Sequence, residues 1–225
     1  MDASPVTLPL DDVQAVSGLF SRPRGARACL VLAHGAGAGM QHPFLAGLAA
    51  DLAARGVACL RYQFPFIERG TKRPDAPAVA HAAVRAAVTA AARLAPRLPL
   101  FAGGKSFGGR MTSQAQAATP LPRVRGIVFV GFPLHAAGKP GVERTAHLGE
   151  VKVPMLFLQG DRDDLADLAL LRPEVARLGR RAHLEVFPGA DHAFHVPVRS
   201  GGNDLRLRAE LAAAVAAWID EVLAA

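Results

Sequence analysis

Residues 98–109 read LPLFAGGKSFGG, and this stretch decides the fold of the chain. Its apolar start predicts a strand, and a helical pattern follows the glycines. Between them Gly104, Ser106 and Gly108 form the pattern Gly-x-Ser-x-Gly, which is typical of a serine on a sharp strand-to-helix turn. Glycines on both sides avoid the collision that a Cβ would cause there. We interpret Ser106 as a nucleophile at a helix N-terminus that favours an oxyanion. A plain glycine turn holding a buried serine is the alternative.

Short apolar segments alternate with longer alanine-rich segments along the rest of the chain. Near-continuous apolar runs indicate strands that are buried on both faces, as in a parallel sheet. We predict strands at residues 29–33, 57–62, 98–102, 127–130, 155–158 and 183–187. We predict helices at residues 43–55, 76–94, 108–118 and 165–178, and a last helix that ends at residue 223. Pro173 predicts a kink or a split in the fourth of these helices, and Asn203 or Asp204 can cap the last one. An antiparallel hairpin is expected at residues 6–19.

This alternation predicts an α/β fold with a mainly parallel, twisted sheet and helices on both faces. No repeat or linker divides residues 1–225, so we expect one domain without a large cap domain. The one long irregular stretch between predicted strands is 133–150, and we expect it to form a loop over the functional site.

The composition excludes several classes of protein. Hydrophobic residues make up 51% of the 225 residues and charged residues 20%, which indicates a globular chain rather than a disordered one. The net charge of +7 is spread along the chain without a nucleic-acid-binding motif, so we expect no nucleic-acid partner. The uncharged stretch 28–50 is interrupted by glycines, two histidines and Pro43, so we expect no membrane span.

The two cysteines, Cys29 and Cys59, have neither the number nor the spacing of a disulfide framework or a metal site. We expect both to be reduced core residues. The first 12 residues are acidic and lack a basic-then-apolar signal pattern. Together these features predict a protein of the reducing cytoplasm, with no metal and no organic cofactor.

Two glycine-rich loops are similar to phosphate-binding motifs but fail on spacing. A P-loop through Ser106 would need glycine at position 99, which is Pro99. A dinucleotide-binding loop at residues 34–40 would need glycine at position 40 or 42, where the chain has methionine and histidine. The loop 34–40 fits an oxyanion loop instead, because it follows a strand and is rich in glycine. The backbone N–H groups of Ala36 and Phe107 are therefore the candidate oxyanion donors.

An acid and then a histidine should follow Ser106 along the chain if the serine is activated by a base. The candidate acids follow the strand predicted at 155–158 and are Asp161, Asp163 and Asp164. The candidate histidines follow the last predicted strand and are His192 and His195. Whole strand–helix units separate these loops, so all of them can open on one edge of the sheet.

Six segments together carry a resemblance to a known family. In chain order they are LAHGAGAGMQHPF, RYQFPF, GGKSFGGRM, GFPLH, LQGDRDDL and GADHAFH. The chain resembles the α/β-hydrolase superfamily in its dienelactone-hydrolase-like branch. Within that branch it is similar to the small group related to the NSL-complex subunit and testis-expressed hydrolase-like proteins.

This resemblance implies a Ser-His-Asp triad. The acid in such hydrolases usually lies three residues after a glycine, which selects Asp163, and the Asp-His pair before Phe194 selects His192. Dienelactone hydrolases use cysteine where this chain has Ser106, so their specific activity is not expected. The absence of a long inserted cap predicts a shallow, open site.

Four further residues are candidates for lining the pocket. His34 and His42 flank the oxyanion loop, His135 follows the segment GFPL, and Phe64 follows a strand end, where core packing is the alternative. The sequence thus predicts a serine hydrolase that cleaves a carboxylic ester or thioester of a small acyl substrate through an acyl-enzyme. A non-catalytic interaction module that retains the fold is the alternative function. The natural substrate and the oligomeric state are left open.

Overall fold

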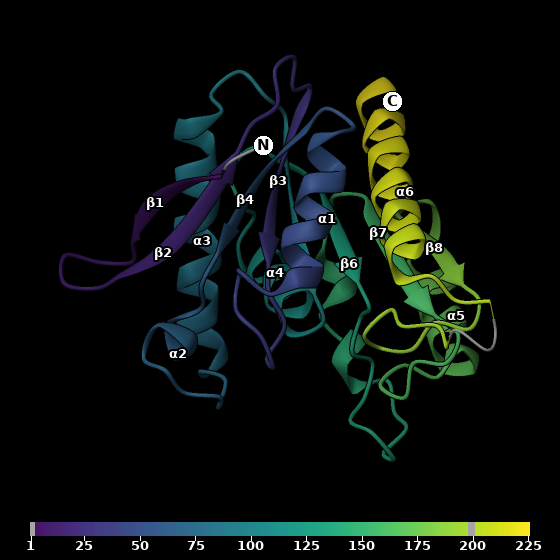
Figure 1. The fold of residues 1–225 in the computed structure, drawn as a ribbon. Coiled ribbons are helices and arrows are strands. Elements are labelled where there is room, and N and C mark those ends of the chain that lie inside the picture. Colours follow the sequence, from purple (N-terminus) through teal and green to yellow (C-terminus); the bar gives the residue numbers. More distant parts are fainter. Residues whose placement is uncertain (1–2, 198–200) are drawn as a thin grey trace.

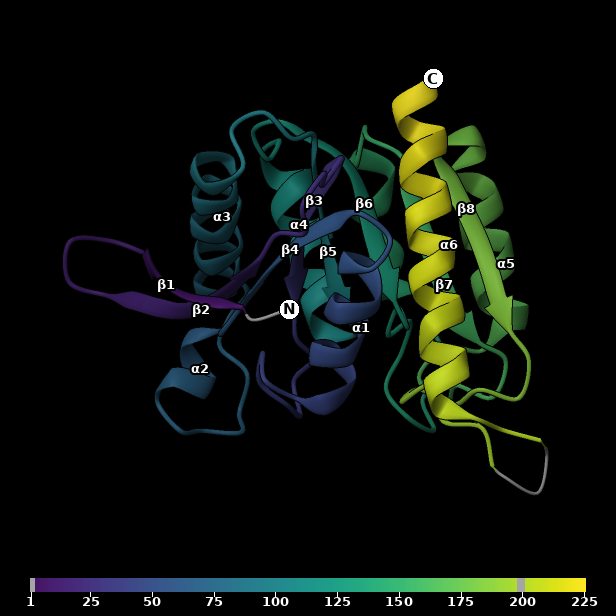
Figure 2. The ribbon, with the colours of Figure 1, turned by 45° about the horizontal axis from the view of Figure 1, so that its top comes forward.

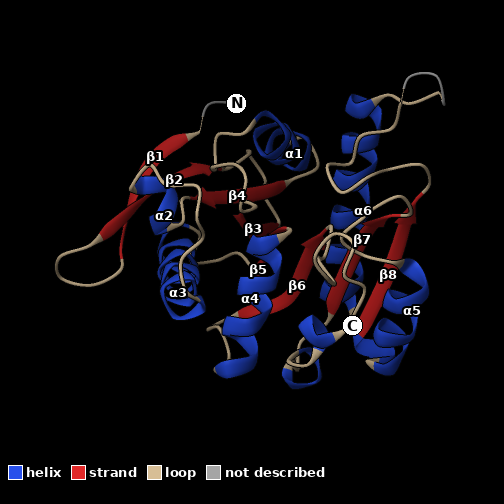
Figure 3. Cartoon of the chain, turned by 90° about the horizontal axis from the view of Figure 1, so that it is seen from below, coloured by secondary structure: helices blue, strands red, loops and turns tan. Residues whose placement is uncertain are grey.

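The computed structural model describes residues 3–197 and 201–225, and across them the chain forms one eight-stranded sheet between two layers of helices (Figure 1). The strand order is β1-β2-β4-β3-β5-β6-β7-β8. The strands are β1 (Ser4–Pro9), β2 (Ala15–Ser21), β3 (Ala28–Ala33), β4 (Val57–Tyr62), β5 (Leu100–Lys105), β6 (Val124–Val130), β7 (Met155–Gly160) and β8 (Ala182–Phe187). Strands β3 to β8 are parallel, and the β1–β2 hairpin is antiparallel and pairs with β4. Figure 3 shows how the strand direction turns across the sheet. The predicted fold class is confirmed.

Helices cover both faces of the sheet, as predicted. On one face α1 (Pro43–Ala53) lies beside α6 (Asp204–Ala224), and the other face carries α3 (Pro77–Leu94), α4 (Phe107–Ala118) and α5 (Leu168–Arg177) (Figure 2). A short helix, α2 (Pro65–Glu68), follows β4. All six residues of β3, of β4 and of β7 are buried, because both of their faces pack against helices.

The side chains of each central strand alternate between two apolar cores. In β3, Val31 packs into the core under α3 and α4, whereas Leu30 and Leu32 pack into the core under α1 and α6. The same alternation separates the two cysteines, because Cys29 belongs to the first core and Cys59 to the second. Both are buried free thiols on opposite faces of the sheet, so they cannot pair without disrupting it.

Two predicted boundaries differ from the structure for identifiable reasons. Strand β5 continues past residue 102 to Lys105, although Gly103 and Gly104 look like turn residues in the sequence. A Cβ on Gly103 would lie 2.0 Å from the Val128 carbonyl oxygen, so this glycine serves close strand packing rather than a turn. Of the kink or split predicted at Pro173, the split is wrong, because α5 continues through this residue.

None of the helices in residues 3–197 and 201–225 is both long enough and apolar enough to cross a membrane.

Candidate active site

Ser106 lies on the turn that joins β5 to α4, with φ 49° and ψ −115°. A non-glycine residue with positive φ is strained, and such strain persists only where the surroundings enforce it. Here the end of β3 enforces it. A Cβ on Gly104 would lie 2.4 Å from the Ala33 carbonyl oxygen, and one on Gly108 would lie 2.5 Å from the His34 carbonyl oxygen. The two glycines therefore let the turn pack directly against β3, which leaves the Ser106 side chain half-buried at the sheet edge.

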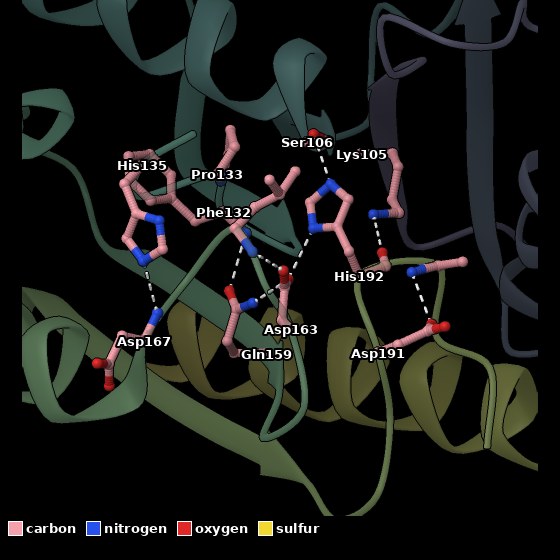
Figure 4. Close-up of polar contacts among 12 residues, drawn as sticks. Lys105, Ser106, Phe132, Pro133, His135, Gln159, Asp163, Asp167, Asp191 and His192 are labelled. Atoms are coloured by element: carbon pink, nitrogen blue, oxygen red, sulfur yellow. Dashed lines mark hydrogen bonds and ion pairs between the residues drawn. The ribbon is translucent and has the colours of Figure 1, made fainter. Parts of the chain in front are cut away.

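A chain of hydrogen bonds links Ser106 to residues from two other loops (Figure 4). The Ser106 Oγ atom lies 2.8 Å from His192 Nε2, and His192 Nδ1 lies 2.7 Å from Asp163 Oδ2. Asp163 follows β7 and His192 follows β8, so all three residues lie at the carboxyl ends of parallel strands. A carboxylate only accepts hydrogen bonds, so the neutral imidazole carries its proton on Nδ1 and presents Nε2 as an acceptor to the serine hydroxyl.

The Asp163 carboxylate is buried, with none of its side chain exposed, and each of its oxygens is held. The backbone N–H of Leu165 donates to Oδ1 over 2.8 Å. Oδ2 accepts from His192 and also from the Gln159 side-chain amide, whose own oxygen accepts from the Phe132 backbone N–H at 2.9 Å (Figure 4). Gln159 is fully buried at the end of β7, and it fixes the orientation of the carboxylate.

Of the other candidates, Asp164 lines the cavity beside Ser106 without a hydrogen bond to His192, whereas Asp161 and His195 lie elsewhere. Asp161 accepts a hydrogen bond from the Gly189 backbone N–H at 2.7 Å and so joins the loops after β7 and β8. His195 is exposed and pairs with Asp204 at the start of α6 over 2.8 Å. The structure therefore brings Asp163 and His192 to Ser106, and it does not bring Asp161 or His195 there.

Two backbone N–H groups are available beside the serine. Phe107 is the first residue of α4, so its N–H has no acceptor within the helix. The Ala36 N–H has no hydrogen-bond acceptor among the described residues. The loop of Ala36 approaches the serine closely, since a Cβ on Gly35 would lie 3.7 Å from Ser106 Cβ.

These groups open into a cavity of about 710 Å³. Its wall combines residues 35–39 of the glycine-rich loop 34–40, the apolar side chains of Phe44, Leu45 and Leu165, and the charged side chains of Lys105, Arg162, Asp164 and Asp191. Ser106 and His192 also line it. The cavity is therefore large enough for a small organic molecule that lies against the serine hydroxyl.

Residues 26–220 match the family described as "Alpha/beta hydrolase domain". The chain belongs to this family. The fold of this α/β-hydrolase is similar to a dienelactone hydrolase from Anabaena variabilis, at 21% identity over 98% of this chain and 97% of that one, with a TM-score of 0.79. It is also similar to an α/β serine hydrolase without lid from Xanthomonas campestris, at 20% identity over 97% and 95% of the two chains, with a TM-score of 0.74. A third similar structure is Est1E from Butyrivibrio proteoclasticus with bound ferulic acid, at 14% identity over 98% and 100%, with a TM-score of 0.75.

The superfamily resemblance in the sequence is thus confirmed, and dienelactone hydrolase is among the similar folds. The narrower resemblance to the NSL-subunit and testis-expressed group stays a prediction.

Of the four predicted pocket residues, two line the cavity of this α/β-hydrolase. His34 is almost fully buried, donates through Nδ1 to the Gly35 carbonyl oxygen over 2.7 Å, and accepts from the Phe64 N–H through Nε2 over 2.9 Å. Burial lowers the pKa of His34, so the neutral ring persists. His42 also lines the cavity, and it caps α1 by accepting from the Phe44 N–H at 3.3 Å.

The other two predicted pocket residues are corrected by the structure. Phe64 is fully buried and packs edge-on against the Phe107 ring at 5.2 Å, so the core-packing alternative is right. His135 does not line the cavity, because its Nε2 accepts from the Asp167 N–H at 3.0 Å and anchors the start of α5 (Figure 4). The prediction that the stretch 133–150 covers the site is also wrong. None of its residues lines the cavity, and its His147 is hydrogen-bonded to Ser113 of α4 at 2.7 Å.

Proposed function

We propose that this α/β-hydrolase is a serine hydrolase that cleaves a carboxylic ester or thioester of a small substrate. One observation carries the proposal: the His192 imidazole bridges the Ser106 hydroxyl at 2.8 Å and the Asp163 carboxylate at 2.7 Å. A hydroxyl, a base within hydrogen-bond reach and a third group that orients the base together make an activated nucleophile.

In this proposal Ser106 Oγ attacks the substrate carbonyl carbon while His192 Nε2 takes the hydroxyl proton. Asp163 holds the imidazole in the required tautomer and stabilises the imidazolium that forms. The N–H groups of Ala36 and Phe107, with the positive end of α4 behind them, stabilise the oxyanion. The imidazolium then gives its proton to the leaving alcohol or thiol, and the acyl group stays on Ser106. His192 next takes a proton from water, whose oxygen attacks the acyl carbon. The bond to Ser106 Oγ then breaks as the imidazolium returns the proton to that oxygen, which releases the carboxylic acid and restores the free serine.

The cavity supports a small acyl substrate rather than a polymer. Phe44, Leu45 and Leu165 offer an apolar wall for an acyl chain, and the volume of about 710 Å³ suits a molecule of drug size. The similar fold from Xanthomonas campestris, described as lacking a lid, and the one with bound ferulic acid support an open site of this kind.

Labelling with a fluorophosphonate probe tests the proposal before any natural substrate is known. The wild type should be labelled and Ser106→Ala should not. Ser113→Ala is the matched control, since Ser113 also contacts a histidine at 2.7 Å, and this variant should be labelled like the wild type. A wild type that resists the probe and hydrolyses neither p-nitrophenyl acetate nor an acetyl thioester would refute the proposal and favour the interaction-module alternative. The ratio of kcat/KM for these two substrates decides between ester and thioester.

A further inference from the structure

Lys105 occupies a position that the triad does not explain. It is the last residue of β5, directly before Ser106, and its side chain is half-buried. Its ammonium group donates a hydrogen bond to the backbone carbonyl oxygen of His192 (Figure 4). The strand that carries the serine is thus joined by a side chain to the backbone of the histidine.

Three surrounding elements are shaped to accept this side chain. Gly131 at the end of β6 makes room for it, since a Cβ there would lie 3.0 Å from Nζ. Gly35 of the oxyanion loop covers the stem, since a Cβ there would lie 3.7 Å from Lys105 Cγ. The Phe194 ring lies under the ammonium, with its centroid 5.4 Å from Nζ, which suits a cation–π contact.

Other hydrogen bonds join the loop that carries His192 to the β7 loop, through Asp161, and to α6, through His195. Among the described residues, the bond from Lys105 is the one that joins the backbone of this loop to the nucleophile strand. Phe194, two residues after His192, has a positive φ of 62°, which is strained for a residue with a side chain. The Asp191 carboxylate stabilises a tight turn within this loop by accepting from the backbone N–H groups of Ala193 and His195, each at 2.8 Å. These bonds shape the loop but do not tie it to Ser106, whereas the Lys105 bond does.

We propose that Lys105 is a positioning residue whose ammonium group ties the His192 backbone to the nucleophile strand and so keeps the imidazole within hydrogen-bond reach of Ser106. This inference rests on the proposed function. A hydrogen bond from an ammonium group is stronger than one from a neutral amine, so the tether depends on the charge. Repulsion between the ammonium and the imidazolium formed during the reaction acts in the opposite direction. Removing the charge should therefore lower kcat if the tether dominates and raise kcat if the repulsion dominates.

The charge should make the tether sensitive to alkaline pH. Burial lowers the pKa of Lys105 to about 8, against the opposing effect of the Asp163 and Asp191 carboxylates. Among the described residues, the charged and titratable groups around the ammonium are these two carboxylates, the His192 imidazole, and the Arg162 and Asp164 side chains that line the same cavity. Because the lysine is charged below this pKa and neutral above it, the tether is at full strength at neutral pH and weakens as the pH rises through about 8.

Lys105→Met removes the donor and keeps an apolar stem of similar length. We expect its kcat for p-nitrophenyl acetate to fall about 10- to 100-fold, because a misplacement of about 1 Å has an effect of that order, with KM changed less than about threefold. The wild-type rate should decline with a midpoint near pH 8, and the variant should lack that decline. Lys72→Met, which removes an exposed lysine with no hydrogen bond among the described residues, is the matched control and should behave as the wild type. Thermal unfolding checks that each variant is folded.

Chemical rescue separates the charge from the packing. Lys105→Cys treated with 2-bromoethylamine regains an ammonium at the original chain length, and treatment with 1-bromopropane gives the same length without charge. The native cysteines are fully buried and should not react. We expect the aminoethyl form alone to recover activity. Equal activity of the two forms, or a Lys105→Met variant as fast as or faster than the wild type, would overturn the inference.

A readout without turnover keeps the two proposals distinguishable. The proton shared by His192 Nδ1 and Asp163 should give a downfield NMR signal, which we expect to broaden or vanish in Lys105→Met and to persist in Lys72→Met. A wild type that the fluorophosphonate does not label and that hydrolyses neither test substrate contradicts the hydrolase function only. An NMR signal unchanged by Lys105→Met contradicts the positioning role, whether or not the enzyme is active.

Discussion

The Asp163→Asn substitution tests the triad most sharply, because the structure dictates which way the new amide must face. The backbone N–H of Leu165 donates to Oδ1, so the amide oxygen of asparagine has to stay at that position. The amide nitrogen then takes the place of Oδ2, where it faces His192 Nδ1. An N–H group there forces Nδ1 to become the acceptor, so the proton moves to Nε2 and the imidazole can no longer accept the Ser106 proton.

The expected loss in kcat/KM is about 10⁴-fold, the effect of a wrong tautomer in a Ser-His-Asp triad. At about 1.36 kcal/mol for each factor of ten, this is ~5 kcal/mol of transition-state stabilisation. The amide nitrogen of asparagine would also face the side-chain amide nitrogen of Gln159. The Gln159 amide cannot rotate by 180° to avoid this, because its oxygen would lose the hydrogen bond from the Phe132 N–H. Two donors that face each other in a buried site should lower the free energy of unfolding by about 1–3 kcal/mol.

Steady-state hydrolysis of p-nitrophenyl acetate and urea unfolding measure these two effects on the same protein. Asp161→Asn is the matched control, because its amide oxygen can still accept from the Gly189 N–H. We expect its kcat/KM to change less than about threefold, which is the size of effect usual for a surface substitution. The reasoning fails if Asp163→Asn keeps kcat/KM within about tenfold of the wild type, or if Asp161→Asn is the more damaged variant.

Three further predictions concern the fold that carries the site. Gly104→Ala should lower the free energy of unfolding by more than about 3 kcal/mol in a urea titration, because its Cβ would lie 2.4 Å from the Ala33 carbonyl oxygen; a wild-type midpoint would contradict this. Burial raises the pKa of the Cys29 thiol to about 12 and raises that of Cys59 as well, so iodoacetamide at pH 8 should modify neither in the native protein, as mass spectrometry can check. Burial and nearby Arg110 lower the pKa of His147 to about 4, so the folded form resists protonation and stability should fall as the pH drops from about 6.5 toward 4. His147→Gln should flatten that fall in urea titrations across this range, and an unchanged slope would exclude His147 as its source.

The sequence predicted the fold, and it predicted which three side chains the structure joins by hydrogen bonds at the sheet edge, because both depend on local signals. A strand, a glycine-flanked serine and a helix are adjacent in the chain, and the buried strands are apolar on both faces. The roles of Gln159, Lys105 and His135 could not be predicted in this way, because their partners lie far away in sequence. Gln159 of β7 accepts from the backbone of Phe132, which follows the neighbouring strand β6, and Lys105 reaches a carbonyl oxygen 87 residues further along the chain. A polar residue at the buried end of a strand, as in LQGDRD, is the one signal that could have indicated Gln159.

A second serine–histidine contact in the same molecule shows why distance alone does not define a nucleophile. Ser113 lies 2.7 Å from His147 Nε2, as close as Ser106 lies to His192. The Ser113 hydroxyl can place its proton on the Arg110 carbonyl oxygen at 3.0 Å, within an ordinary helix turn, so the hydroxyl accepts from the imidazole instead of donating to it. No carboxylate among the described residues is hydrogen-bonded to this imidazole, and the low pKa of His147 opposes the uptake of a proton.

Ser106 differs from Ser113 in each of these respects. Its hydroxyl stands on a strained turn at the open edge of the sheet, with no helix carbonyl oxygen as a competing acceptor among the described residues. Its histidine is oriented by a buried carboxylate that is itself held by two other donors. In the proposed mechanism, the chemistry therefore depends on the whole hydrogen-bond chain from Gln159 to Ser106. For this reason a change at Asp163 should reduce activity far more than the loss of one hydrogen bond, whereas Ser113→Ala should leave activity intact.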